Sequence, residues 1–167
     1  MPKRQSYIEY KAVGNWSRVM LKLANLDPMI KRAARSSQYV LGRDIISRVK
    51  GHLKNQDLGW KKLAKSTIKR KGHSIALLEY GTYYENIRLW QKDLLVNVGV
   101  PQGVKEKNNT ETALMAAFHE YGAKGVPKRP LWNPTFREMG GSEGIRVRLV
   151  RGIKNYLEDR GYNIRWQ

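Results

Sequence analysis

The stretch that decides the fold class is residues 82–100, TYYENIRLWQKDLLVNVGV. Its aromatic, leucine and β-branched residues predict two strands, residues 82–91 and 93–100, with a turn near Lys92. Apolar residues in the second strand fall on one face at Leu94, Val96 and Val98. The stretch therefore predicts an antiparallel β-hairpin.

A long amphipathic helix is predicted before the hairpin. Asp27 can cap it, Pro28 suits its first position, and the pattern continues to about Lys54. Its apolar face consists of Ile30, Ala34, Leu41, Ile45, Val49 and Leu53. Its other face is basic, with Lys31, Arg32, Arg35, Arg43, Arg48 and Lys50. A second, short basic helix is predicted from Trp60 to about Gly72.

A last helix follows the break at residues 140–142. Ser142 can cap it, and it should end near Gly161 with a stripe formed by Ile145, Leu149, Ile153 and Leu157. We therefore predict an α+β fold in which the long helix and the C-terminal helix pack on an antiparallel sheet built around the hairpin.

One domain is expected over residues 1–167. Its predicted parts are a core (27–136), an amino-terminal extension (1–26) and a C-terminal helix with tail (142–167). In the extension, Ser6 to Leu26 fits a strand or a helix. Pro101 to Asn109 predicts an exposed loop.

The charge is strongly positive and unevenly distributed. The chain has 32 Lys plus Arg against 14 Asp plus Glu, a net charge of +18. Residues 81–120 are nearly neutral, with 4 basic and 5 acidic side chains. The densest basic cluster, predicted to contact phosphate or an acidic partner, is Lys61, Lys62, Lys65, Lys69, Arg70 and Lys71. Solubility alone is the alternative explanation.

Catalytic motifs are not apparent. Cysteine is absent, and His119-Glu120 lacks the second histidine of the zinc-protease pattern, because Ala123 occupies that position. Neither a phosphate-binding loop nor a nucleophile elbow occurs. We therefore predict a protein that is not an enzyme and uses no cofactor or metal. A nuclease with paired carboxylates and a metal is the alternative.

No uncharged apolar run approaches the roughly 18 residues that a membrane span needs. We therefore expect a soluble protein without a secretion signal and without a membrane partner.

Residues 110–136 predict a docking segment. An apolar helix ends at a glycine, and a proline-stiffened arm with large apolar side chains follows. The predicted docking residues are His119, Tyr121, Gly122, Pro127, Arg129, Pro130, Leu131, Trp132 and Phe136. Alternatively, these residues fold back onto the chain's own sheet, and the two uses are compatible.

In order along the chain, these motifs resemble the Mu-type virion morphogenesis (tail completion) family of tailed bacteriophages, related in layout to lambdoid head-to-tail neck proteins. The resemblance spans roughly residues 26–136. It begins with an amphipathic helix and then Gly59-Trp60, Leu63, Thr67 and the basic residues Lys69 to Lys71. A degenerate Leu77 to Gly81 element and Val98-Gly99 come next. The last elements are His119, Tyr121, Gly122, Pro127, Arg129, Pro130 and Leu131.

The resemblance implies a structural virion protein, made in the host cytoplasm and located at the neck or tail top. It implies a homo-oligomeric ring that contacts neck or connector and tail-tube proteins and joins tail to head. Genome DNA passing through such a ring would be a nonspecific partner of the basic side chains. The alternative is a nonspecific nucleic-acid-binding protein that uses its basic surfaces.

Overall fold

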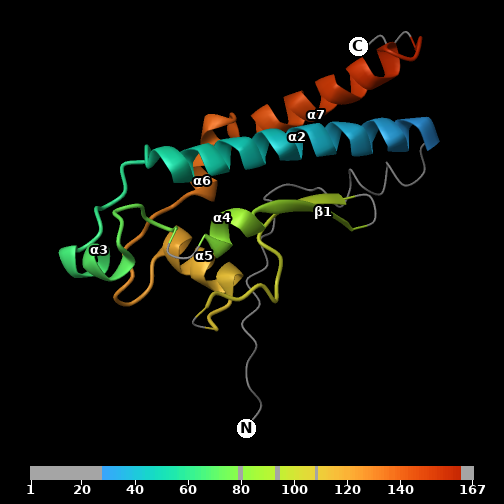
Figure 1. Ribbon diagram of the computed structural model, residues 1–167. Coiled ribbons are helices and arrows are strands. Elements are labelled where there is room, and N and C mark those ends of the chain that lie inside the picture. Colours follow the sequence, from blue (N-terminus) through green and yellow to red (C-terminus); the bar gives the residue numbers. More distant parts are fainter. Residues whose placement is uncertain (1–27, 79–80, 93–94, 108, 163–167) are drawn as a thin grey trace.

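Figure 1 shows the computed structural model, which describes residues 28–78, 81–92, 95–107 and 109–162. The helices and strands are α2 (Pro28–Asn55), α3 (Lys65–Lys71), α4 (Thr82–Asn86), β1 (Arg88–Lys92), β2 (Leu95–Gly99), α5 (Thr112–Tyr121), α6 (Trp132–Glu138) and α7 (Gly141–Glu158). The α+β class, the antiparallel hairpin, the long helix and the C-terminal helix are confirmed. The ambiguous segment Ser6 to Leu26 lies outside the described residues.

Helix α2 is the centre of the fold, with the hairpin along one side and α7 along another (Figure 1). A Cβ atom at Gly42 would overlap the side chain of Leu89 in β1, so the glycine lets helix and sheet approach closely. On the α7 side, Gly152 lies against Ser37. The C-terminal helix thus packs mainly on α2, because α2 already covers the apolar face of the hairpin.

The hairpin pairs Arg88 with Gly99 at one end and Lys92 with Leu95 at the other. The predicted first strand is wrong over its first five residues, which form α4. Tyr83 and Ile87 are four residues apart, and both are buried in the core, with 3% and 1% of their surface exposed. Helical spacing therefore decides the local structure here over the strand preference of tyrosine.

The core lies under the C-terminal half of α2. It consists of Val49, Leu53, Ala76, Leu77, Tyr83, Ile87, Ala116 and Leu131. The predicted apolar face of α2 is confirmed at Ala34, Val49 and Leu53, which are buried. One predicted cap is wrong: α7 follows Gly140 rather than Ser142.

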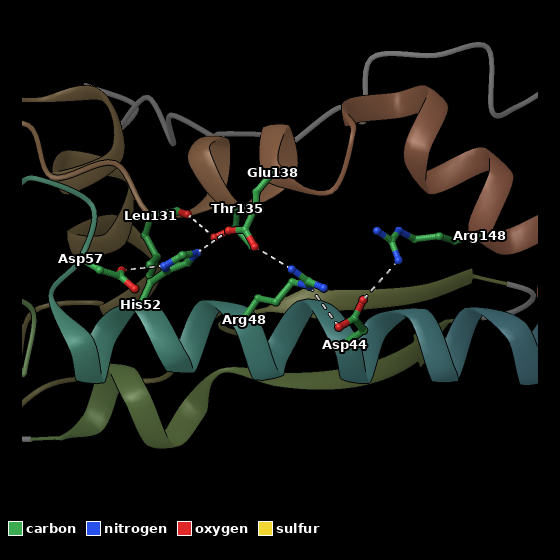
Figure 2. A network of polar contacts seen from close by, with 8 residues as sticks. All are labelled: Asp44, Arg48, His52, Asp57, Leu131, Thr135, Glu138 and Arg148. Carbon is green, nitrogen blue, oxygen red and sulfur yellow. Dashed lines mark hydrogen bonds and ion pairs between the residues drawn. The ribbon is translucent and has the colours of Figure 1, made fainter.

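A polar network joins α2 to α6 (Figure 2). Arg48 donates to Asp44 at 3.1 Å and to Glu138 at 2.6 Å, and these carboxylates, Asp44 first, raise the pKa of Arg48. His52 lies between Asp57, 2.7 Å from its Nδ1, and Glu138, 2.9 Å from its Nε2. The hydrogen bond to His52 lowers the pKa of Asp57. Glu138 therefore connects α6 to two successive turns of α2.

Candidate docking segment

The predicted docking segment turns back at the end of α5. Gly122 has a φ of 85°, a value that glycine adopts without strain, and its N–H donates to the carbonyl of Phe118. Ala123 and Val126 then form an isolated antiparallel bridge. The N–H of Arg129 donates to the carbonyl of His119 at 2.7 Å, so the arm returns alongside the helix it has just left.

The carboxylate of Glu120 holds the far end of the arm. This side chain is only 4% exposed. Its Oε2 accepts from the N–H groups of Leu131 at 2.7 Å and Trp132 at 3.0 Å, and its Oε1 accepts from Asn133 at 2.8 Å. These are the first N–H groups of α6, which lack partners inside the helix and carry partial positive charge. A side chain from α5 therefore caps α6.

Arg129 points into the chain, and only 6% of the residue is exposed. Its Nε and Nη2 donate to the carbonyl oxygen of Lys61 at 3.3 and 3.2 Å, and burial lowers the pKa of its guanidinium. Next to it, the indole N–H of Trp60 donates to the carbonyl of Pro130 at 2.8 Å. Two elements about seventy residues apart in sequence are thereby joined through backbone carbonyls.

These contacts correct the predicted helix at Trp60. Only residues 65–71 are helical, in α3. The carbonyl of Lys61 accepts from Arg129, and the Trp60 indole is fixed to Pro130, so residues 60–61 are held by tertiary contacts. The helical spacing of the apolar residues near Trp60 predicted a helix, but tertiary contacts with Arg129 and Pro130 determine the backbone conformation there.

His119 is half-buried beside the arm. Burial, followed by the charges of Arg129 and Lys71, lowers its pKa to about 4, against a smaller opposite effect of a hydrogen bond with the Pro127 backbone. Its buried Nδ1 has no hydrogen-bond partner among the described residues. The imidazole is therefore neutral at neutral pH, and it serves as a packing group at the turn.

The structure divides the predicted docking residues into two sets. Leu131 is 1% exposed in the core, and the half-buried Trp132 donates its indole N–H to the Tyr83 hydroxyl at 3.0 Å. Tyr121 and Phe136, by contrast, are 51% and 45% exposed. The apolar tip of the arm thus packs on its own chain, while two aromatic rings stay at the surface.

An exposed apolar stripe on α5 includes the predicted docking residue Tyr121 and two residues that were not predicted, Leu114 and Phe118. Leu114, Phe118 and Tyr121 are all classed as exposed large hydrophobic residues. Their offsets of 0, 4 and 7 place them on one face of the helix, a spacing visible in the sequence. Helix α5 itself contains no lysine or arginine, unlike α2, α3 and α7 of this basic protein.

The basic cluster lies next to the docking segment, on the loop before α3 and on α3 itself (Figure 1). Five of its six members are exposed: Lys61, Lys62, Lys65, Lys69 and Arg70. Lys71 is half-buried and donates to the carbonyl of Ile75 at 2.9 Å. The cluster is thus an accessible positive surface.

Other kinds of site find no support in the described part of the chain. No group of three or more His, Asp or Glu side chains there is placed to hold a metal ion. None of its helices is long and apolar enough to cross a membrane. No family model, curated protein or solved structure matches this chain.

Proposed function

We propose that this protein is a structural virion component of a tailed bacteriophage. It acts as a tail completion or neck protein, without enzymatic activity, in a ring of identical subunits that joins tail to head. The ordered motif set is the main support. In the fold, the Gly59-Trp60 element and the Pro127 to Leu131 element contact each other directly through Trp60 and Arg129. Motifs separated in sequence therefore act as one structural unit.

The α5 stripe is the face best suited to contact between neighbouring subunits. A chain with a net charge of +18 repels its own copies, and this repulsion is weakest where lysine and arginine are absent. Leu114, Phe118 and Tyr121 supply exposed apolar surface on such a helix. Aromatic side chains of this kind are frequent anchors of protein interfaces.

Electron microscopy of the purified protein and of virion necks tests the proposal. We expect closed rings and the presence of the protein in particles. A Phe118→Asp substitution should dissociate the rings while leaving the far-ultraviolet circular dichroism unchanged. The matched control is Val40→Asp on α2, where the side chain is 68% exposed and outside the α5 stripe. A strictly monomeric wild-type protein that is absent from particles would refute the proposal.

A second candidate function is nonspecific nucleic-acid binding through the basic cluster. The supporting observation is that five of its cations are exposed on one short segment. Binding to duplex DNA should weaken with salt, the logarithm of affinity falling by about 0.9 per phosphate neutralised for each tenfold rise in salt. No binding at low salt would eliminate this function.

A further inference from the structure

The hairpin has an outer face that α2 does not cover. Leu89 and Val98 point toward Gly42 of α2, and side chains alternate along a strand. The opposite face therefore carries Arg88, Trp90 and Lys92 from β1 and Leu95, Asn97 and Gly99 from β2. All three β1 residues of this outer face are exposed.

Trp90 lies across the sheet on this face. A Cβ built at Gly99 would be 3.6 Å from Cη2 of the indole, so the ring rests over a position without a side chain. The residue is still 36% exposed. An indole supported on one side and open to solvent is a surface on which a flat ring can stack.

Two cations flank this indole. Arg88 and Lys92 are each two residues away along β1, which places them about 7 Å on either side of Trp90. No ion pair between described residues involves either one. The described residues of the outer face include no carboxylate. As far as the described residues extend, the face therefore combines an aromatic platform with positive charge that no carboxylate pairs.

We propose that the outer face of the hairpin binds single-stranded nucleic acid, with a base stacked on Trp90 and neighbouring phosphates on Arg88 and Lys92. Stacking on an aromatic side chain beside cations is the common mode of single-strand binding. In a duplex the bases are already stacked and paired, so an open indole face gains nothing from them. A second copy of this chain would bring like charges together. This inference is independent of ring assembly.

Fluorescence anisotropy with a labelled oligothymidine and with a duplex of equal length, at low salt, tests the proposal. Trp90→Leu should weaken single-strand binding about tenfold or more and leave duplex binding unchanged. Trp90→Phe, which keeps an aromatic ring, should restore part of the loss. Circular dichroism verifies that each variant is folded.

Two double variants show whether single-strand binding depends on the cations beside Trp90 or only on the net charge of the protein. Arg88→Gln/Lys92→Gln and Lys61→Gln/Lys62→Gln each remove two positive charges. The first should reduce the single-strand salt slope by about 1.4, at about 0.7 per phosphate, and the second should have a smaller effect. Equal losses in both double variants, or equal losses of single strand and duplex in Trp90→Leu, would overturn the proposal. So would a change of oligomeric state in Trp90→Leu without any loss of single-strand binding.

Discussion

The docking segment and the outer face of the hairpin contrast in where they place their large side chains. The docking segment was predicted to present large apolar anchors to a partner or to fold back onto the chain, and Leu131, at 1% exposed, folds back, as does Arg129 at 6%. The hairpin was predicted as a sheet for helices to cover, yet Trp90 on its outer face is 36% exposed. Size and apolarity alone therefore do not determine which residues face solvent.

The difference follows from polar partners. Three sets of polar groups in the docking segment find partners within the chain. The first N–H groups of α6 donate to Glu120, the guanidinium of Arg129 donates to the carbonyl of Lys61, and the carbonyl of Pro130 accepts from the Trp60 indole. Such bonds are favoured in the interior because an unpaired buried group is costly. The outer face of the hairpin has no comparable set of partners among the described residues, and its side chains remain at the surface.

The substitution that we expect to lower the free energy of unfolding most is at Glu120, which holds the docking segment on its own chain. Glu120→Ala leaves three N–H groups of α6 without their acceptor, and we expect a loss of about 4 kcal/mol in the free energy of unfolding. Glu120→Gln keeps one acceptor oxygen and should cost less. Urea denaturation followed by circular dichroism measures both.

The control for that prediction is Glu111→Ala. Glu111 precedes α5, the helix that contains Glu120, and among the described residues its carboxylate accepts one exposed bond, from the Gly103 N–H at 3.3 Å. It should change stability by less than about 1 kcal/mol. Equal effects of the two alanine variants would mean that Glu120 does not hold the docking segment.

Alanine substitutions at Leu131 and Phe136 test whether the first side chain is buried in the core and the second lies at the surface. Leu131→Ala opens a cavity in the core and should cost about 3 kcal/mol. Phe136→Ala, at a residue that is 45% exposed, should cost less than about 1 kcal/mol. Chemical denaturation gives both values. A larger loss for Phe136 than for Leu131 would contradict the inward placement of the arm.

The sequence predicted those parts of the fold that depend on neighbouring residues. Pro28 marks the first residue of α2, and the alternation of β2 correctly assigned Val98 to the apolar face. It did not predict α6, because the cap of that helix comes from Glu120, eleven to thirteen residues earlier in the chain. The predicted helix at Trp60 was too long for a similar reason, since Arg129 takes the carbonyl of Lys61.

The candidate sites show the same limit. Spacing alone could have identified the α5 stripe, because Leu114, Phe118 and Tyr121 repeat at helical intervals. The exposed platform at Trp90 could not be inferred, since it depends on which face of the hairpin α2 covers. The hydrogen bonds of Glu138 with Arg48 and His52 join residues about ninety positions apart, and no local pattern indicates them.

The smallest predicted effect concerns acid sensitivity at the turn of the docking segment. The pKa of His119 is lowered to about 4 from an ordinary value of 6.5. Between these values the unfolded chain binds a proton that the folded chain does not, so this group should reduce stability as the pH falls from 6.5 to 4. The full difference in pKa would correspond to about 3 kcal/mol, and solvent around the half-buried ring should reduce the loss to about 1 kcal/mol.

Unfolding measured at pH 7 and pH 4.5 in wild type and His119→Gln isolates this contribution from that of the carboxylates. The variant should lose less stability on acidification than wild type does. Nuclear magnetic resonance titration should locate the pKa of His119 near 4, and Lys71→Met should raise it, because one of the two repelling charges is removed. A titration midpoint near 6.5 in the folded wild type would show that the turn is open to water, and hence that the arm does not pack against α5.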